Sequence, residues 1–311
     1  MRVVAALGGN ALSPPHGTGS VDEMAAALAE TCRHLADLVA AGVDLVLTHG
    51  NGPQVGRILL QQEAAAPAVP PMPMDVCGAQ SQGQIGYLLA QHLDNALRAR
   101  GVDRAVLCLV TQVVVDGYDP AFRRPAKPVG PFFAEADARR IAAETGYVMR
   151  QFGDGRWRRV VASPLPVRFV EEAAVLQTIA AGHIVVAAGG GGVPVVEENG
   201  VLRGVEAVVD KDLSAARLAD LADADVLLIL TEVAAVQQGF GTADARELRT
   251  LTAGAARELL AAGEFPDGSM GPKVEAACRF VEGGGGRAVI TDLANAGNAV
   301  FGDAGTQLTA G

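Results

Sequence analysis

Short apolar runs alternate along the chain with longer segments in which apolar residues recur every three to four positions. The runs predict buried strands, and the segments with helical spacing predict amphipathic helices. The predicted strands are 3–7, 43–48, 105–115, 183–188, 226–231 and 287–290, and the clearest predicted helices are 21–41 and 81–100. Strands separated by helices of this length pair mainly in parallel, with helices on both faces. The pattern therefore predicts an α/β fold, a three-layer sandwich around a central, mainly parallel sheet.

Residues 116–166 depart from this alternation. They hold a cluster of prolines, namely Pro120, Pro125, Pro128, Pro131, Pro164 and Pro166. Because proline and glycine punctuate regular structure, we expect an inserted flap here, a small subdomain that protrudes from the sheet. A second proline-rich stretch, residues 64–74, predicts an ordered surface loop.

Glycine-rich turns follow three of the predicted strands. Gly8-Gly9-Asn10 follows the first strand, Gly50-Asn51-Gly52 follows the second, and four glycines at 189–192 follow the strand at 183–188. Ligands of such sheets bind beyond the carboxyl ends of the strands. Glycine lets backbone N–H groups approach an anion, and a following helix N-terminus adds partial positive charge. The turns are therefore candidate phosphate-binding loops, although neither GxxxxGK[ST] nor GxGxxG occurs.

The net charge excludes some classes of partner. The chain carries −10 at pH 7, with a pI near 5.0. A nucleic-acid binder needs a basic stripe, and the densest basic cluster is the short stretch 156–159. We expect that cluster to be the solvated face of a hairpin, so no nucleic-acid partner is predicted.

Cysteine spacing and the apolar runs bear on metal sites and location. The four cysteines are Cys32, Cys77, Cys108 and Cys278, and no two have CxxC spacing, which argues against a zinc site or a redox dithiol. The run at 3–7 is too short for a signal peptide, and no run reaches the ~18 apolar residues of a membrane helix. We expect a soluble, cytoplasmic protein.

Lysine is scarce. Of 25 basic residues only three are lysines, Lys127, Lys211 and Lys273, which leaves 22 arginines. Arginine evidently serves where generic positive charge is enough, so a retained lysine indicates a need for a compact ammonium group. Phosphoryl transfer has that need, because charge on the equatorial and leaving oxygens must be neutralised. Three lysines in turns marked by glycine, proline or aspartate therefore predict a phosphotransferase.

Seven motifs, in order along nearly the whole chain, resemble those of carbamate kinase. They are Ala-Leu-Gly-Gly-Asn-Ala-Leu at 6–12, Thr-His-Gly-Asn-Gly-Pro-Gln-Val-Gly at 48–56, Ser-Gln-Gly-Gln-Ile-Gly-Tyr at 81–87, Lys-Pro-Val-Gly-Pro-Phe at 127–132, Gly-Gly-Gly-Gly-Val-Pro-Val at 189–195, Gly-Val-Glu-Ala-Val-Val-Asp-Lys-Asp-Leu at 204–213 and Gly-Ser-Met-Gly-Pro-Lys-Val-Glu-Ala at 268–276. Each motif alone is weak, but together they are highly specific.

The resemblance implies the amino acid kinase fold, built as a homodimer. It implies an acceptor lobe at 1–205, with the flap at about 116–166, and a nucleotide lobe at 206–311. The implied reaction converts carbamoyl phosphate and ADP reversibly into carbamate and ATP by direct in-line transfer, as part of arginine metabolism. Mg²⁺ is expected to arrive with the nucleotide.

The resemblance also assigns residues to three roles. The substrate-binding residues are Gly8, Gly9, Asn10, Gly50, Asn51 and Gly52. The catalytic residues are Lys127, Lys211, Asp212 and Lys273. The nucleotide-binding residues are Lys211, Thr231, Glu232, Val233, Gly268, Ser269, Met270 and Lys273. No residue is assigned to a resident metal, and His49 is expected to make a structural hydrogen bond rather than act as a base.

The sequence departs from the family pattern at a few positions. Most relatives in the wider superfamily carry a lysine just before the first glycines, where this chain has Ala6 and Leu7. In the carbamate kinase arrangement that function passes to Lys127. Glu232 stands where the family has aspartate, and Ala126 stands where it has serine or threonine.

Three alternatives stay open from the residues. One is a kinase of the same fold that acts on another small carboxylate or a phosphonate. The second is a Rossmann oxidoreductase, against which the missing GxGxxG weighs. The third is a non-catalytic relative that acts as a binding subunit.

Overall fold

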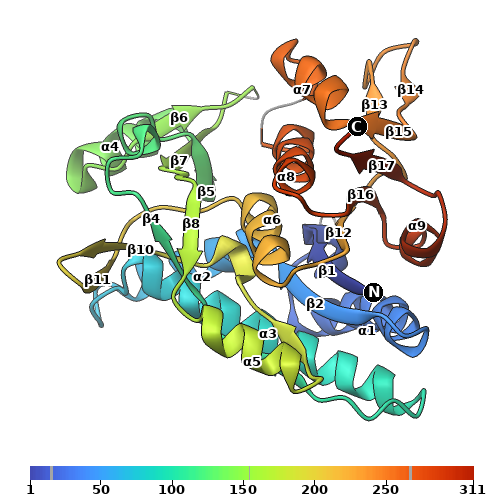
Figure 1. The fold of residues 1–311 in the computed structure, drawn as a ribbon. Helices are drawn as coiled ribbons and strands as arrows, with labels where there is room; N and C mark the ends of the chain where they lie inside the picture. Colours follow the sequence, from blue (N-terminus) through green and yellow to red (C-terminus); the bar gives the residue numbers. More distant parts are fainter. Residues whose placement is uncertain (15–16, 154, 266–267) are drawn as a thin grey trace.

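The structure, a computed structural model, describes residues 1–14, 17–153, 155–265 and 268–311 (Figure 1). Its central layer is an eight-stranded sheet. The strands are β1 (Arg2–Leu7), β2 (Asp44–His49), β3 (Val106–Cys108), β9 (Ile184–Val186), β12 (Val226–Thr231), β15 (Thr250–Thr252), β16 (Arg287–Asp292) and β17 (Thr306–Thr309). Their order is β15-β17-β16-β12-β1-β2-β9-β3, and every pair is parallel except β16–β17.

The two faces of this sheet have separate cores because side chains alternate along each strand. From β1, Val3, Ala5 and Leu7 pack with α1 (Val21–Ala40), α3 (Met74–Arg98) and α9 (Ala296–Phe301). Val4 and Ala6 pack on the other side with α5 (Glu172–Ala180), α6 (Lys211–Leu221), α7 (Ala253–Ala261) and α8 (Met270–Glu282). Both faces of β1 are buried, which explains its continuous apolar sequence. The predicted three-layer α/β/α sandwich is confirmed.

Smaller elements surround this core. A four-stranded sheet has the order β11-β10-β4-β8. Its strands are β4 (Gln112–Val115), β8 (Pro166–Phe169), β10 (Val193–Glu198) and β11 (Val201–Gly204), and β13 (Gln237–Gln238) pairs separately with β14 (Arg246–Glu247). Helix α2 (Gly52–Ala65) lies outside the two cores, and short 3-10 turns occur at η1 (Gly9–Ala11), η2 (Pro120–Arg123) and η3 (Gly189–Gly191).

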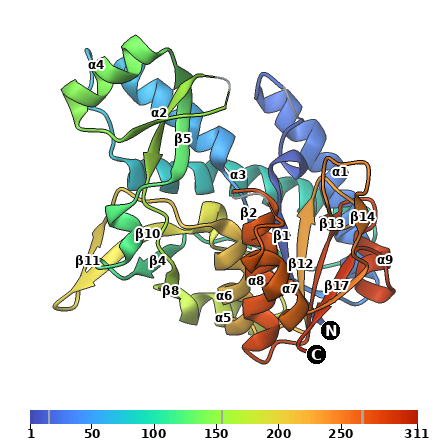
Figure 2. The same ribbon diagram turned by 90° about the horizontal axis from the view of Figure 1, so that it is seen from above.

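The flap stands apart from the main sheet and lies next to α2 (Figures 1 and 2). It consists of a three-stranded sheet, β5 (Lys127–Phe133), β7 (Trp157–Val161) and β6 (Met149–Gln151), together with α4 (Glu135–Thr145). Its backbone comes close to α2, since a Cβ on Gly56 would lie 3.7 Å from the Gly130 Cα. The predicted division into an acceptor lobe and a nucleotide lobe remains a prediction, and one continuous sheet runs through both.

Two predicted elements have different bounds in the structure. The expected single strand at 105–115 is wrong, because β3 and β4 belong to different sheets. The buried Gln82 side chain causes the break: its Oε1 accepts from the Thr111 N–H at 2.8 Å, and its Nε2 donates to the Thr111 carbonyl at 3.1 Å. The helix expected at 81–100 begins earlier, at Met74, directly after Pro73. The predicted surface loop is therefore confined to 66–73.

The basic cluster at 156–159 is less solvated than expected. The Arg158 guanidinium donates to the Gly130 carbonyl at 2.6 Å, and burial lowers its pKa. The Arg159 side chain is only 11% exposed. Across the described ranges, no helix is both long and apolar enough to span a membrane.

Candidate active site

Helix α6 begins beside the carboxyl end of the sheet and carries the sequence Asp210-Lys211-Asp212 at its start. Asp210 is the N-cap, and its Oδ1 accepts from the Asp212 N–H at 2.9 Å. An aspartate in this position satisfies a free N–H of the first turn, and its charge suits the helix dipole. The cap therefore makes Lys211 the first residue of the helix and directs Asp212 inward, where it is 3% exposed.

Asp212 lies between two ammonium groups. Its Oδ1 accepts from Lys211 Nζ, and its Oδ2 accepts from Lys273 Nζ at 3.0 Å. Burial alone would raise the pKa of Asp212, but the two lysines outweigh it and hold the pKa below its usual range. Burial lowers the pKa of Lys211, while Asp212 opposes that shift. The predicted orientation of lysines by Asp212 thus has a geometric basis in Lys211 and Lys273.

The third lysine reaches the same place from the flap. Lys127 opens β5, and its Nζ lies 2.6 Å from Asp210 Oδ2. Asp210 thus binds α6 through one oxygen and Lys127 through the other. Sequence reasoning did not assign a role to Asp210, although its position next to Lys211 could have suggested one. Three lysines that are far apart in the chain therefore meet at two neighbouring carboxylates.

The predicted substrate-binding glycines lie against this cluster. A Cβ on Gly50 would lie 3.3 Å from Lys211 Cδ, and a Cβ on Gly8 would lie 2.8 Å from the Leu230 carbonyl oxygen. The lack of a side chain at these positions permits this close packing. Gly52 is the first residue of α2, Asn10 lies in η1, and the Asn10 side chain is outside the described part of the structure.

Asn51 has a fixed environment. Its Nδ2 donates to Ser81 Oγ at 2.8 Å, and Ser81 is fully buried. A Cβ on Gly190 would come within 2.2 Å of the same nitrogen. Glycine is therefore required at position 190, which also has a φ of +67°. Ser81 is a second residue whose contact with the site the sequence did not predict.

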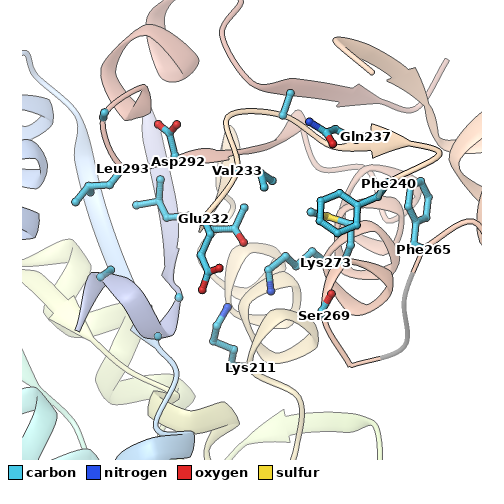
Figure 3. Close-up of a pocket in the computed structure, with 18 of the residues that line it drawn as sticks. Lys211, Glu232, Val233, Gln237, Phe240, Phe265, Ser269, Lys273, Asp292 and Leu293 are labelled. Carbon is cyan, nitrogen blue, oxygen red and sulfur yellow. The ribbon is translucent and has the colours of Figure 1, made fainter. Parts of the chain in front are cut away.

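A cavity of ≈ 580 Å³ opens next to the lysine cluster. All the predicted nucleotide-binding residues line it, namely Lys211, Thr231, Glu232, Val233, Gly268, Ser269, Met270 and Lys273. In Figure 3, Lys211, Lys273 and Glu232 converge at one end of the cavity, and Phe240 and Phe265 lie at the other. The charged end suits phosphates and the aromatic end suits a planar base.

The cavity takes in only some of the predicted substrate-binding and catalytic residues. Gly8 and Gly9 line it, whereas Lys127 and the turn 50–52 are not among its lining residues. The turn 50–52 instead meets the cavity residues through Lys211, against which Gly50 packs. Phe240 and Phe265 line the cavity without having been predicted, because neither belongs to a motif.

His49 makes the structural hydrogen bond that was expected. It is 1% exposed, and its Nδ1 lies 2.9 Å from the Gly50 carbonyl oxygen, which requires Nδ1 to carry the proton. Complete burial lowers the pKa of His49 to about 4, and the positive charge of Lys211 adds to that shift. His49 is therefore neutral at pH 7 and supports the turn next to Lys211.

Comparison with known proteins identifies the family. The profile of the amino acid kinase family matches residues 1–292. The carbamate kinase of Pyrococcus horikoshii is 47% identical over 310 residues, which cover 99% of this chain and 99% of that protein. The chain belongs to the carbamate kinase branch of the amino acid kinase family.

Solved structures agree with this assignment. A crystal structure from Aeropyrum pernix K1 has a TM-score of 0.96 and 43% identity, and covers 100% of both chains. Carbamate kinase from Giardia lamblia bound to AMP-PNP has a TM-score of 0.93 and 40% identity, over 99% of this chain and 98% of that one. The predicted amino acid kinase fold and carbamate kinase resemblance are confirmed, and a Rossmann oxidoreductase does not fit this family.

No lysine precedes the first glycines in this chain, and Ala6 and Leu7, which stand there, are fully buried in β1. Lys127 brings its ammonium to the cluster from the flap instead, where Asp210 binds it.

Proposed function

We propose that this protein is a carbamate kinase that transfers a phosphoryl group reversibly between carbamoyl phosphate and ADP. The single observation that supports this best is the convergence of Lys127, Lys211 and Lys273 on Asp210 and Asp212. The cluster lies between glycine turns and a cavity large enough for a nucleotide. Family membership gives the reaction class, and the cluster supports a catalytic chain rather than a binding subunit.

The proposed transfer is direct. A terminal β-phosphate oxygen of ADP attacks the phosphorus of carbamoyl phosphate, the P–O bond to the carbamoyl group breaks, and carbamate leaves with that bond's electrons. No side chain needs to act as nucleophile or base, because both the attacking and leaving oxygens are anionic. The lysines neutralise the charge that spreads over the transferring group. Asp210 and Asp212 hold the lysines in position before the reaction.

The nucleotide is proposed to fill the cavity, with its phosphates at Lys211 and Lys273. Its base lies at the Phe240 and Phe265 end. Mg²⁺ comes with the nucleotide and is part of that substrate, and Glu232, which lines the cavity, is proposed to bind its water shell. The turns at 8–10 and 50–52 are proposed to bind the acceptor.

The decisive experiment mixes the protein with carbamoyl phosphate and Mg-ADP and measures ATP by a luciferase assay. We expect rapid formation of ATP, and carbamate-dependent ADP release in the reverse direction. A panel with acetyl phosphate and other acyl phosphates tests the alternative acceptor. Turnover of one of these, with none of carbamoyl phosphate, would assign the chain to another small-acid kinase.

Lys127→Ala tests the role of the flap lysine. Loss of one fixed charge at a transferring group costs about a hundredfold to a thousandfold in kcat. Lys127→Arg should not restore the activity, because a planar guanidinium does not replace a compact ammonium group. Full activity of the arginine variant would refute the argument from lysine scarcity.

We further propose that the chain forms a cytoplasmic homodimer. Strand β3 is an edge of the main sheet, and apolar side chains are exposed near it: Leu107 is 36% exposed, Val110 48% and Tyr87 63%. An exposed edge of this kind favours association with a second copy. Analytical ultracentrifugation should give twice the 31.8 kDa chain mass. A place in arginine metabolism remains a prediction.

A further inference from the structure

One face of the flap sheet meets the segment that leads into α6. Strands β5 and β7 pair antiparallel, with Lys127 opposite Val161 and Val129 opposite Arg159. Residues that are directly opposite, or two apart along a strand, share a face. Lys127, Val129, Arg159 and Val161 therefore form one face, which we call the docking face.

The segment 206–210, which leads into α6, has a complementary alternation. Ala207 and Val209 are buried, 2% and 1% exposed. Val208 instead packs against Val129 and Val161 of the docking face. Its N–H also donates to the Ala162 carbonyl at 3.0 Å, just beyond β7. The alternate residues of this segment are therefore the ones that contact the flap.

The two ends of the segment hold the flap by charge. At the inner end, Asp210 binds Lys127. At the outer end, Arg159 Nη2 lies 2.6 Å from Glu206 Oε2, with Arg159 11% and Glu206 52% exposed. The Arg159 guanidinium carbon also lies 3.4 Å from the ring centre of Tyr147, which belongs to the flap. Stacking on the ring limits the orientations of the guanidinium and so presents it to Glu206.

We propose that Tyr147, Arg159 and Glu206 form a latch that docks the flap and so positions Lys127 at Asp210 before substrate binds. This rests on the proposed function for its effect on catalysis. The latch residues touch no reacting atom and act through Lys127. Because carbamoyl phosphate, the phosphate donor, binds only molecules whose flap is docked, its apparent affinity falls as the docked fraction falls. In the bound complex Lys127 is already in place, so kcat does not depend on the latch.

Glu206→Gln tests the latch with a nearly isosteric change. The matched control is Glu135→Gln, which removes the acid of an exposed ion pair with Arg139 within α4 of the same flap. A half-exposed pair contributes modestly, so we expect flap opening to become about twofold to fivefold more frequent in Glu206→Gln. The KM for carbamoyl phosphate should rise by up to that factor, with kcat unchanged.

Amide hydrogen exchange measures docking without any turnover. The Val208 N–H bonds to the Ala162 carbonyl and reports docking, whereas the Ala126 N–H bonds to the Val161 carbonyl within the flap side of the molecule. Glu206→Gln should speed exchange at Val208 about twofold to fivefold and leave Ala126 unchanged. Faster exchange at both amides would indicate local unfolding of the flap and would overturn the proposal.

Further outcomes separate the latch from the reaction. Unchanged exchange at Val208, or a fall in kcat at constant KM, would refute the latch even if the enzyme is active. If no acyl phosphate is turned over, the exchange result stands alone and only the proposed function fails. Tyr147→Leu removes the stack without changing any charge, and it should speed exchange at the Val208 N–H in the same way. It replaces Glu206→Gln as the test if that variant does not fold.

Discussion

The core and the flap hold their lysines in different ways. Lys211 and Lys273 belong to helices α6 and α8, whose apolar faces lie in one core, and they share the buried carboxylate of Asp212. Lys127 belongs to a separate three-stranded sheet, and its side chain is 28% exposed, against 13% and 15% for the core pair. Asp210, the contacts of the docking face and the packing of β5 on α2 keep it there.

This difference indicates two separate tasks. The core pair is fixed by the packing that holds the domain together, so its charge is present whether or not substrate is bound. The flap lysine depends on a docking equilibrium, so its charge is in place only in the docked fraction of molecules. A mutation in the core should therefore affect stability and activity together, whereas a mutation in the flap should affect activity alone.

Asp212→Asn should give the largest effect. It leaves the buried Lys211 ammonium with a neutral partner, and breaking a buried pair costs about 3–5 kcal/mol of unfolding free energy. With the ammonium groups no longer held, kcat should fall at least about a hundredfold. Urea denaturation and the ATP assay measure the two effects.

Asp220→Asn is the matched control, since Asp220 lies on the same helix. Burial raises the pKa of Asp220, so its charge is unfavourable in the fold and the amide should not destabilise it. If Asp212→Asn kept full stability while losing activity, Lys211 and Lys273 would not be fixed by the packing of the core, and the contrast with the flap lysine would fail.

The pH dependence of the unfolding free energy should show that His49, beside the core lysines, is shielded from water. His49 has a pKa of about 4 in the folded protein, below the ordinary value of about 6.5. Between these values the unfolded chain binds a proton that the folded chain does not, so stability falls as pH drops from 6.5 to 4. The slope is about 1.4 kcal/mol per pH unit, for a total of about 3 kcal/mol.

His49→Gln should remove that slope, and His92→Gln should leave it in place. Thermal unfolding at half-unit pH steps measures the difference. The contribution of Asp212 has a separate window: its lowered folded pKa means that its stabilisation is lost only as pH falls below about 4. A slope that persists in His49→Gln between pH 6.5 and 4 would have to come from another group.

Gly56→Ala, in the helix that packs against the flap, should give the smallest effect, a slight rise in the free energy of unfolding. A Cβ there would meet only the Gly130 backbone, at 3.7 Å and 3.9 Å, which is ordinary van der Waals contact. Alanine in a helix interior is favoured over glycine by about 0.5–1 kcal/mol. The control is Gly83→Ala in α3, where nothing lies within 4 Å. Destabilisation by Gly56→Ala alone would show that the flap packs on α2 more closely than described.

The sequence predicts the central sheet and the lysines of the site well. Its strands are short apolar runs because both faces of the sheet are buried, and its glycine turns follow the strand ends. The scarcity of lysine marks the residues that meet at the site, since each of the three is retained in a chain that otherwise uses arginine for positive charge. The motifs of the family then pick out residues that line the cavity beside the lysine cluster.

What the sequence does not predict depends on contacts between distant segments. Asp210 and Asp212 flank Lys211 alike, and only the first turn of α6 decides that one binds Lys127 and the other Lys273. The interruption at Thr111 depends on Gln82, which lies on a different element. Arg159 looks like a solvated charge until the docked flap brings Glu206 to it.

The gathering of all three lysines at one place has a practical consequence for spectroscopy. Reductive methylation with ¹³C-formaldehyde would add carbon labels to the lysine ε-amines and otherwise only to the amino terminus. A two-dimensional NMR spectrum would then hold three lysine resonances, each from an ammonium group beside Asp210 or Asp212. The chain thus offers a direct view of its three clustered lysine charges, with the amino terminus as the other labelled amine.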